Sequence, residues 1–465
     1  MRYVVDRSYE RHDLVILGGS PLRILRVAPG AIGVLTDLET AAELHPSPSE
    51  QALLNKLEDA GLIHPAPDLS ALPSAHRVPI ITPVYRGSST DTNPSAKSSA
   101  SSPLGTVPGA LLVDDGSHPP IREAQIRLDP NAGPAAARNA GLERAIVDFA
   151  ETEYVIFLDA DVDPGTDPHW YAPLLALCER DPRLAVVAPR VCSRSGPSRL
   201  ERYERNHSPL DLGDQPGQVQ PGSRIGYLPS TALVCRVSAL REVSGFSTDL
   251  RFGEDVDLIW RLIAAGWKCR YYPDVVVHHP PRSGWAAWSR QRIGYGTSAA
   301  ALALRHGSKV APARLHPISL VTWVLILGGH VGVAGVAIAG SVFSLAHKVP
   351  ALPGDVATRI SLSGTWRSGL GLAQAIRRVW WPVLVPLSLI SRRVRRLVIF
   401  TLLASGAPRV DTAITIADDL SYSFGVWIGV INQLRTGTAD APRRRALWSL
   451  LPATSTTKQT ATVRT

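Results

Sequence analysis

The sequence has 465 residues, enough for two or three domains, and carries a formal net charge of +9. The segment Arg377–Arg396 is densely basic, but its arginines alternate with tryptophan and aliphatic residues, which favours a membrane surface and argues against nucleic acid as the partner. The four cysteines are widely scattered, which excludes the spacings of zinc and redox motifs and favours buried thiols in a reducing compartment.

Residues 1–75 predict a small separate module. The first eleven residues are too charged for a secretory signal, so we expect the catalytic part of the chain at the cytoplasmic face of the cell membrane. Two short strands around the Gly-Gly-Ser-Pro turn at 18–21 precede a helix that starts near Ser49. This pattern resembles the winged-helix peptide-chaperone domains of pathways that mature ribosomally made peptides. Residues 66–74, rich in proline and alanine, are the expected linker.

Residues 76–306 alternate strands with helices. We expect strands at 78–85, 110–117, 154–158 and 184–189, and helices at 139–149 and 171–178. This alternation predicts an α/β fold whose parallel sheet is wound in both directions. Residues 87–108 are rich in Ser, Thr and Pro, which form helices poorly, and we expect a loop there.

Two acidic residues, Asp159 and Asp161, follow the strand expected at 154–158. A buried strand of an open α/β sheet delivers such residues to its carboxyl edge, where ligands bind. Paired carboxylates there suit Mg²⁺ or Mn²⁺, usually shared with the phosphates of a substrate. An ordinary acidic turn is the alternative, because aspartate is common in turns.

Two neighbouring elements carry further charged candidates. Asp114 and Asp115 end the strand expected at 110–117, where they could accept hydrogen bonds from a nucleoside, and a solvated turn explains them equally well. Residues 131–141 supply a tight turn and a helix start whose free N–H groups favour anions. Arg138 in that segment could reach a diphosphate, although an exposed arginine is the default.

A second acidic pair, Glu254 and Asp255, opens a helix expected at 256–265. At a helix start over the sheet edge, one of these carboxylates could act as a base. Acidic residues are also ordinary at helix starts as caps, so the pattern alone leaves both interpretations open. Asp257 is expected to be structural, with Arg261 as its partner four residues further on.

Five motifs occur in an order that is more informative than any one of them. They are Thr82–Tyr85, Val113–Ser117, Asn131–Gly141, Leu158–Val162 and Gly253–Leu258. The series resembles the family 2 inverting glycosyltransferases, which have the nucleotide-sugar-binding A-type fold, and the resemblance covers residues 78–272. Two departures concern the shape of the uracil pocket: Arg86 stands where the family usually has Asn, and the Ser-rich segment 88–107 replaces a helix.

The resemblance implies a role for each site residue. A UDP-sugar donor would contact Pro83, Tyr85, Asp114, Asp115, Arg138 and Asp159. Asp159 and Asp161 would bind Mg²⁺ or Mn²⁺, which offsets the charge that develops on the leaving diphosphate. Asp255 would be the general base, and Glu254 would position the acceptor.

A weaker resemblance concerns the segment that follows. Processive members of the superfamily bind the acceptor with a Gln-Arg-rich motif that contains tryptophan. The corresponding residues here, at a different spacing, are Trp285, Trp288, Gln291 and Arg292. An amphipathic helix on the sheet or on a membrane is the alternative.

Residues 307–435 predict an apolar and basic helical region associated with a membrane. Residues 318–346 contain no charged side chain apart from histidine and are long enough to cross a bilayer, with a buried helical hairpin as the alternative. Residues 380–390 are too short to span and are expected at the membrane interface. Two later runs, 397–403 and 422–431, are expected to make further membrane contacts, and we expect residues 436–465 to be disordered.

A peptide-chaperone-like module joined to such a transferase and an apolar tail resembles the glycosyltransferases of the mycofactocin system. That resemblance implies UDP-glucose as the donor, a peptide-derived redox cofactor or its precursor as the acceptor, and a β-linked oligoglucose chain as the product. One alternative is a membrane synthase that extends a cell-wall polysaccharide or a glycolipid. Another is a non-enzymatic scaffold that docks a peptide, against which the intact acidic pairs argue.

Overall fold

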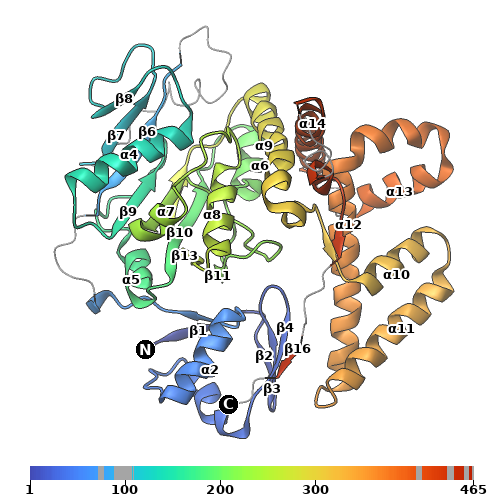
Figure 1. Cartoon of the computed structure of the whole chain (residues 1–465). Coiled ribbons are helices and arrows are strands. Elements are labelled where there is room, and N and C mark those ends of the chain that lie inside the picture. The colour runs from blue at the N-terminus through green and yellow to red at the C-terminus, as the bar shows by residue number, and fades with distance from the viewer. Residues whose placement is uncertain are drawn as a thin grey trace. The chain divides into compact units, whose positions relative to one another are not determined.

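The computed structural model describes residues 1–71, 78–87, 107, 109–404, 411–436, 445–454 and 460–462. The chain divides into two compact units, drawn with their elements in Figure 1. The first unit comprises Met1–Ser8, Gly19–Pro21 and Gly33–Trp288, and the second comprises Tyr9–Gly18, Leu22–Ile32 and Ser289–Thr465. Most of the loop expected at 87–108 lies outside the described residues.

An eight-stranded sheet forms the centre of the first unit. Its strand order is β11-β13-β10-β12-β9-β6-β7-β8. The strands are β6 (Ile80–Val84), β7 (Leu111–Asp115), β8 (Ile126–Leu128), β9 (Tyr154–Leu158), β10 (Leu184–Ser193), β11 (Gly217–Gln218), β12 (Ala232–Arg236) and β13 (Lys268–His279). The sheet is mixed, because β12 runs antiparallel to both of its neighbours, β9 and β10. We did not predict β12, and the prediction of a wholly parallel sheet was therefore wrong. The predicted α/β class is confirmed.

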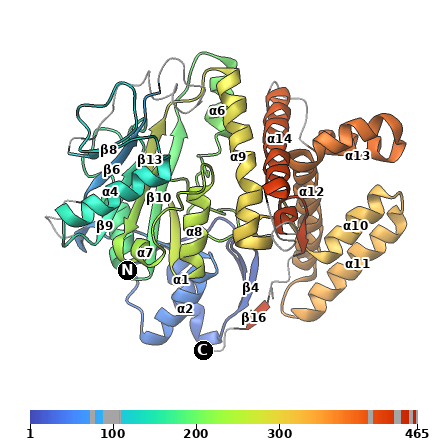
Figure 2. The ribbon, with the colours of Figure 1, turned by 45° about the horizontal axis from the view of Figure 1, so that its top comes forward.

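The four strands predicted at 78–85, 110–117, 154–158 and 184–189 correspond to β6, β7, β9 and β10. β9 has the predicted bounds, and each of its five residues is buried. Alternate residues face opposite layers: Ile80 and Ile156 contribute to a core shared with α5 (Ala172–Arg180). On the other side, α4 (Pro134–Asp148) packs against β6 and β7. Figure 2 shows α4 beside β6.

Helix α4 begins earlier than the predicted 139–149. Gly133 adopts a positive φ of 93°, which a glycine tolerates, and Pro134 then occupies the first helical position, where its missing N–H costs nothing. The other helices of this part are α6 (Arg199–His207), α7 (Val237–Glu242) and α8 (Glu254–Ala264). The early start of α4 places Arg138 inside the helix, one turn from its beginning.

The N-terminal part of the first unit packs on the same sheet. β1 (Tyr3–Val5) pairs antiparallel with β5 (Ile63–Pro65), beside α1 (Ile32–Glu39) and α2 (Pro48–Asp59). Ser47 and Glu50 form a capping box at the start of α2, close to the predicted start at Ser49. At the other end of α2, Glu58 forms a buried ion pair with Arg270 of β13, at 2.5 Å between Oε1 and Nη2.

The second unit combines a small sheet with long helices. β2 (Glu10–His12), β3 (Val15–Gly18) and β4 (Arg23–Arg26) form the hairpins, and β16 (Thr460–Thr462) lies parallel to β4. The helices are α9 (Trp285–His306), which begins in the first unit, α10 (Pro317–Leu327), α11 (Val331–Lys348), α12 (Gly354–Ile390), α13 (Arg392–Leu403) and α14 (Thr412–Thr436). α12 packs against α10, α11, α13 and α14. Short strands β14 (Arg314–Leu315) and β15 (Ala453–Thr454) pair in parallel. β15, η4 (Leu447–Ser449) and β16 all lie within residues 436–465, where we expected disorder.

The apolar run at 318–346 is neither one span nor a buried hairpin. Gly328 ends α10, and Gly329 takes a positive φ of 87° before α11 begins. The two helices pack together, yet only 6% of α11 is buried. α11 and the residues Thr412–Arg435 are long and apolar enough to cross a membrane, by length and composition.

Candidate active site

Arg138 joins the two acidic pairs. Its Nη2 lies 2.7 Å from Oδ1 of Asp159, which follows β9, and its Nη1 lies 3.1 Å from Oε1 of Glu254, which opens α8. Arg138 is only 3% exposed, so the alternative of an exposed surface arginine is wrong. One side chain on α4 thus links the carboxyl end of a strand to the start of a helix more than a hundred residues away.

Arg138 keeps its positive charge although it is buried. Burial disfavours a charged guanidinium, but the carboxylates of Asp159 and then Glu254 raise the pKa of Arg138 above its ordinary value. The guanidinium carbon lies 5.4 Å from the centre of the Phe246 ring, and Nε has no hydrogen-bond partner among the described residues. An unpaired buried donor beside two carboxylates is suited to an anionic ligand.

Asp161 has a different partner. Its Oδ2 lies 3.2 Å from Nε2 of His279, the last residue of β13. Although burial opposes the charged form, the hydrogen bond from His279 lowers the pKa of Asp161. The alternation of β13 exposes His278 and turns His279 toward Asp161. His279 is therefore a site candidate that the motif series did not include.

Asp159, Asp161 and His279 supply two carboxylates and an imidazole. These are ligand types that Mg²⁺ and Mn²⁺ accept in proteins, so the donor chemistry fits a divalent cation. Within the ranges that the structure describes, no three acidic, histidine or cysteine side chains already converge as a metal-binding group. Asp159 is engaged by Arg138 instead, and burial raises the pKa of its carboxyl group.

Asp114 and Asp115 are buried, which contradicts a solvated turn. Asp114 accepts hydrogen bonds from the backbone of Ser117 and Ile121 and from Arg127. Asp115 accepts from the backbone N–H groups of Ala132 and Gly133 at 2.8 and 2.9 Å and from Asn131. These two N–H groups belong to the turn before α4 and are occupied by Asp115, and the anion-binding role of the helix start stays a prediction. Both aspartates fix the loops around the sheet edge, and their contact with a nucleoside stays a prediction.

Pro83 and Tyr85 lie at the end of β6, beside the loop that follows β7. Both are half-buried. The backbone N–H of Arg86 donates to Oγ of Ser117 at 2.9 Å, which joins the loops after the two strands. The position agrees with the donor-binding role inferred from the family resemblance, which stays a prediction.

Glu254 and Asp255 stand at the start of α8 because Gly253 takes a left-handed φ of 79° there. Asp255 Oδ1 accepts from the backbone of Val256 at 2.7 Å, and the backbone of Ser230 also stabilises the charged form of this carboxyl group. Burial raises the pKa of both carboxyl groups, and for Glu254 the neighbouring Asp255 raises it further. A carboxylate with a raised pKa is a better proton acceptor, which suits a general base.

Asp257 has the structural role that we predicted. It is fully buried and accepts hydrogen bonds from Nε of Arg261 and from Oγ of Ser247, both at 2.7 Å. The pairing with Arg261 therefore confirms the i, i+4 prediction.

Of the residues expected to bind the acceptor, Trp288 and Arg292 are buried, whereas Trp285 and Gln291 are more accessible. Trp288 is fully buried and donates from Nε1 to Glu204 at 2.8 Å, so no face of its indole is left for a sugar. Arg292 is buried and pairs with Asp418 at 3.0 Å. Trp285 is exposed, and Gln291 donates to the hydroxyl of Tyr295 at 2.9 Å. The sequence could not separate these cases, because packing decides them.

A sequence model described as "Glycosyl transferase family group 2" matches residues 154–431. The chain belongs to this family. It is 35% identical over 473 aligned positions to the "Pre-mycofactocin glycosyltransferase" of Mycobacterium tuberculosis, which covers 91% of this chain and 93% of the relative. It is also 27% identical to the "N-acetylglucosaminyl-diphospho-decaprenol L-rhamnosyltransferase" of that organism, over 37% of this chain and 67% of the relative.

Membership of the family and the mixed eight-stranded sheet confirm the expected A-type glycosyltransferase fold. Among solved structures, a mannosyltransferase of Pyrobaculum calidifontis in complex with GDP-Man and Mn²⁺ is similar at 17% identity and a TM-score of 0.33, covering 74% of this chain and 92% of that chain. Such a TM-score carries no further information about this site.

Proposed function

We propose that this glycosyltransferase transfers glucose from UDP-glucose to mycofactocin, a peptide-derived redox cofactor, or to its precursor, and that repeated transfer builds a β-linked oligoglucose chain. The supporting observation is the 35% identity to a pre-mycofactocin glycosyltransferase along nearly the full length of both chains. Such coverage extends well beyond the transferase domain alone.

The chemistry that we propose is a single displacement with inversion at the anomeric carbon. Asp255 takes the proton of the acceptor hydroxyl as that oxygen attacks the sugar, and the nucleoside diphosphate leaves from the opposite face. The backbone N–H of Val256 holds the Asp255 carboxylate in place, and the backbone of Ser230 stabilises its charged form. Glu254 fixes Arg138 and lies next to the base, where it positions the acceptor.

Asp159, Asp161 and His279 are the residues that would hold Mg²⁺ or Mn²⁺. A bound divalent cation offsets the negative charge that develops on the leaving diphosphate. Arg138 provides a second positive charge beside Asp159, with an unpaired Nε available to a phosphate oxygen. The charges of this chain are therefore arranged around the place where the leaving group would lie.

Mass spectrometry of the acceptor tests this proposal. The purified chain is incubated with UDP-glucose, Mn²⁺ and the mature mycofactocin core, and a ladder of hexose additions is expected. Asp255→Asn should abolish the ladder, because the amide cannot take the proton. Asp148→Asn is the matched control: this exposed carboxylate pairs with Arg144 on α4 and should leave the ladder unchanged.

Other outcomes favour the alternatives. Release of UDP without a ladder would keep the donor and overturn the acceptor, which favours a membrane synthase that extends a glycolipid or polysaccharide. Neither UDP nor product from a folded protein would favour another donor or the peptide-docking scaffold.

We also propose that the N-terminal module recognises the peptide-derived part of the acceptor. Deleting residues 1–75 is a poor test, because it removes Glu58, the buried ion-pair partner of Arg270 on β13, and so disturbs the transferase domain as well. Point substitutions on the exposed face of the module are better. Weaker acceptor use with unchanged donor hydrolysis would support the role, and equal loss of both would contradict it.

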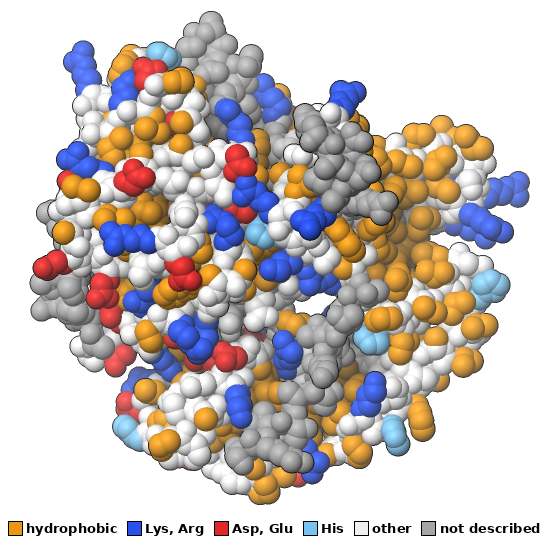
Figure 3. All heavy atoms as spheres, in the orientation of Figure 1, with side chains coloured by type: hydrophobic (Ala, Val, Ile, Leu, Met, Phe, Trp, Pro, Cys, Tyr) orange, Lys and Arg blue, Asp and Glu red, His pale blue; other side chains and the backbone are white. Residues whose placement is uncertain are grey.

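The second unit is proposed to lie on or in the cytoplasmic face of the membrane. Large apolar side chains are exposed on it, as Figure 3 shows around α11 and α13. They include Val331, Val336 and Phe343 on α11, Leu389 and Ile390 at the end of α12, and Leu403 on α13. Beside them are four exposed arginines, Arg392, Arg393, Arg395 and Arg396. Apolar residues next to arginines suit an anionic lipid surface.

Sedimentation with vesicles tests the membrane proposal. Binding to phosphatidylglycerol vesicles should be severalfold stronger than to phosphatidylcholine vesicles, and Phe343→Asp should weaken it. Phe149→Asp, which changes an exposed phenylalanine of the first unit, is the matched control. Equal effects of the two substitutions would contradict a lipid-binding surface on α11.

A further inference from the structure

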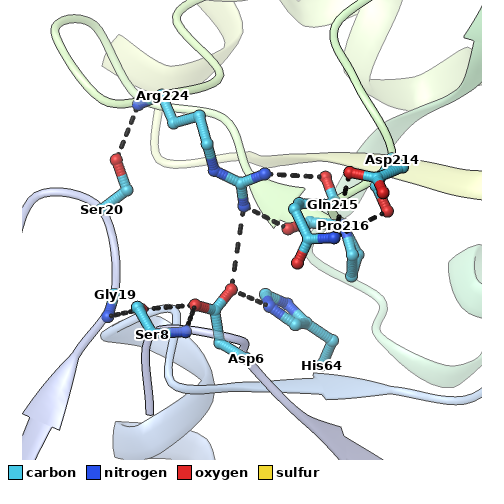
Figure 4. Close-up of polar contacts among 9 residues, drawn as sticks. All are labelled: Asp6, Ser8, Gly19, Ser20, His64, Asp214, Gln215, Pro216 and Arg224. Carbon is cyan, nitrogen blue, oxygen red and sulfur yellow. Dashed lines mark hydrogen bonds and ion pairs between the residues drawn. The ribbon is translucent and has the colours of Figure 1, made fainter.

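A cluster of polar side chains joins the N-terminal residues to a loop of the transferase domain within the first unit (Figure 4). The loop comprises residues 209–231 and is called the connecting loop. Nε2 of His64 lies 2.9 Å from Oδ2 of Asp6, and Nη2 of Arg224 in the connecting loop lies 3.7 Å from the same oxygen. The backbone N–H of Arg224 donates to Oγ of Ser20 at 2.7 Å. Two separate contacts therefore hold Arg224.

The negative charge of Asp6 is stabilised within this cluster. Its side chain is only 9% exposed. Burial alone would raise the pKa of Asp6, but the hydrogen bonds with His64 and Ser8 lower it to about 2. A carboxylate that is buried and still ionised near neutral pH makes a defined anchor for the arginine beside it.

Arg224 also holds the connecting loop together. Its Nη1 and Nη2 donate to the backbone carbonyls of Gln215 and Pro216, at 3.1 and 2.7 Å. After Arg224 the chain becomes buried, with Ile225 and Leu228 almost inaccessible. The carbonyl of Gly226 accepts from Nε1 of Trp260 at 2.8 Å, which fixes the loop to α8.

The far end of the connecting loop reaches the candidate active site. The carbonyl of Thr231 accepts from the backbone N–H of Asp159 at 2.9 Å, and the backbone of the preceding residue, Ser230, stabilises the charged form of Asp255. The segment from Arg224 to Thr231 is therefore anchored at one end by Asp6 and Ser20 and at the other by the acidic pairs, with Trp260 of the base-bearing helix between them.

We propose that Arg224 is a positioning residue: the Asp6–His64 cluster and Ser20 hold it, and through the connecting loop it sets where Ser230 places the carboxylate of Asp255. The proposal rests on the role of Asp255 as the base. It assigns the N-terminal residues a part in the chemical step besides any contact with the acceptor. A base held within a fraction of an ångström depends on such supporting contacts.

Two substitutions on the N-terminal side test this, and neither changes the loop itself. Asp6→Asn keeps the shape and removes the charge, and Ser20→Ala removes one acceptor. Each should lower kcat for hexose transfer about tenfold and leave the Kd for UDP, measured by calorimetry, within twofold. Hydrogen exchange at residues 215–230 should become faster in both variants, while exchange in β9 should not change.

Two control substitutions distinguish an effect on the position of Asp255 from a general weakening of the contact between the N-terminal residues and the transferase domain. Arg7→Ala breaks an exposed ion pair with Asp214 of the same loop, and Lys268→Ala breaks a pair between β13 and Asp59 of α2. Both should keep wild-type kcat.

The proposal is overturned if Asp6→Asn and Ser20→Ala keep wild-type kcat, or if the affinity for UDP falls as much as kcat does. It is also overturned if the two control substitutions lower kcat by the same factor. These outcomes concern Arg224 alone, provided that the wild-type chain transfers hexose. If the wild type transfers none, the proposed function fails instead.

Discussion

At the residue scale, Arg138 is the side chain on which the site depends most. Its planar guanidinium bridges Asp159 and Glu254 through two separate nitrogens, whereas a lysine would offer both carboxylates one ammonium at a different position. Arg138→Lys should therefore lower kcat for transfer roughly a hundredfold while the protein stays folded. Arg144→Lys on the same helix changes only an exposed pair and should have no effect on rate assays. Near-normal kcat in Arg138→Lys would show that the bridge is dispensable.

The second residue-scale prediction concerns pH. Because burial raises the pKa of Asp255, the base is protonated, and kcat/KM falls, at a pH above the ordinary carboxyl range of about 4. Glu254→Gln removes a neighbouring negative charge, which makes ionisation of Asp255 easier. The acid limb of the pH–rate profile should therefore move to lower pH by about one unit. An acid limb that stays in place or moves upward would contradict the coupling of the two carboxylates.

At the element scale, the close contact of α4 with the sheet places Arg138. Gly141 faces Ile81 of β6, and an added Cβ would come within 2.3 Å of Cγ2 of that side chain. Gly141→Ala should push α4 outward, destabilise the fold by about 1–3 kcal/mol and slow transfer as Arg138 shifts. The matched control is Gly364→Ala on α12, where nothing lies within 4 Å, and it should be neutral or slightly stabilising. Urea unfolding and kcat measured on both variants check this, and equal effects would contradict it.

Elements differ in how well the sequence predicted them. β9 was predicted residue by residue, because a buried apolar run that ends in Asp159 has one interpretation. α12 was missed, since its glycines and serines lower helix propensity and its stability comes from packing against four other helices. The break at Gly328 and Gly329 was visible in the sequence, but an apolar run of spanning length outweighed it.

The candidate site was predictable only in part. The acidic pairs followed from their place at the ends of expected elements, and the structure brings Asp159 and Glu254 to the same arginine. The pairing of Asp161 with His279 and the burial of Trp288 depend on contacts between segments far apart in the chain. No local pattern encodes such contacts, so the sequence alone did not predict them.

At the scale of the whole molecule, the chain combines an N-terminal part that we predicted to be a peptide-chaperone-like module, a family 2 transferase domain and helices with exposed apolar faces. The central claim is that the acceptor is the peptide-derived cofactor. A competition experiment tests it most directly: the full chain receives UDP-glucose with the mycofactocin core and a polyprenyl-phosphate acceptor in one vesicle suspension, and mass spectrometry follows both. We expect hexose on the mycofactocin core alone. Hexose on the polyprenyl phosphate, with the mycofactocin core unmodified, would contradict it.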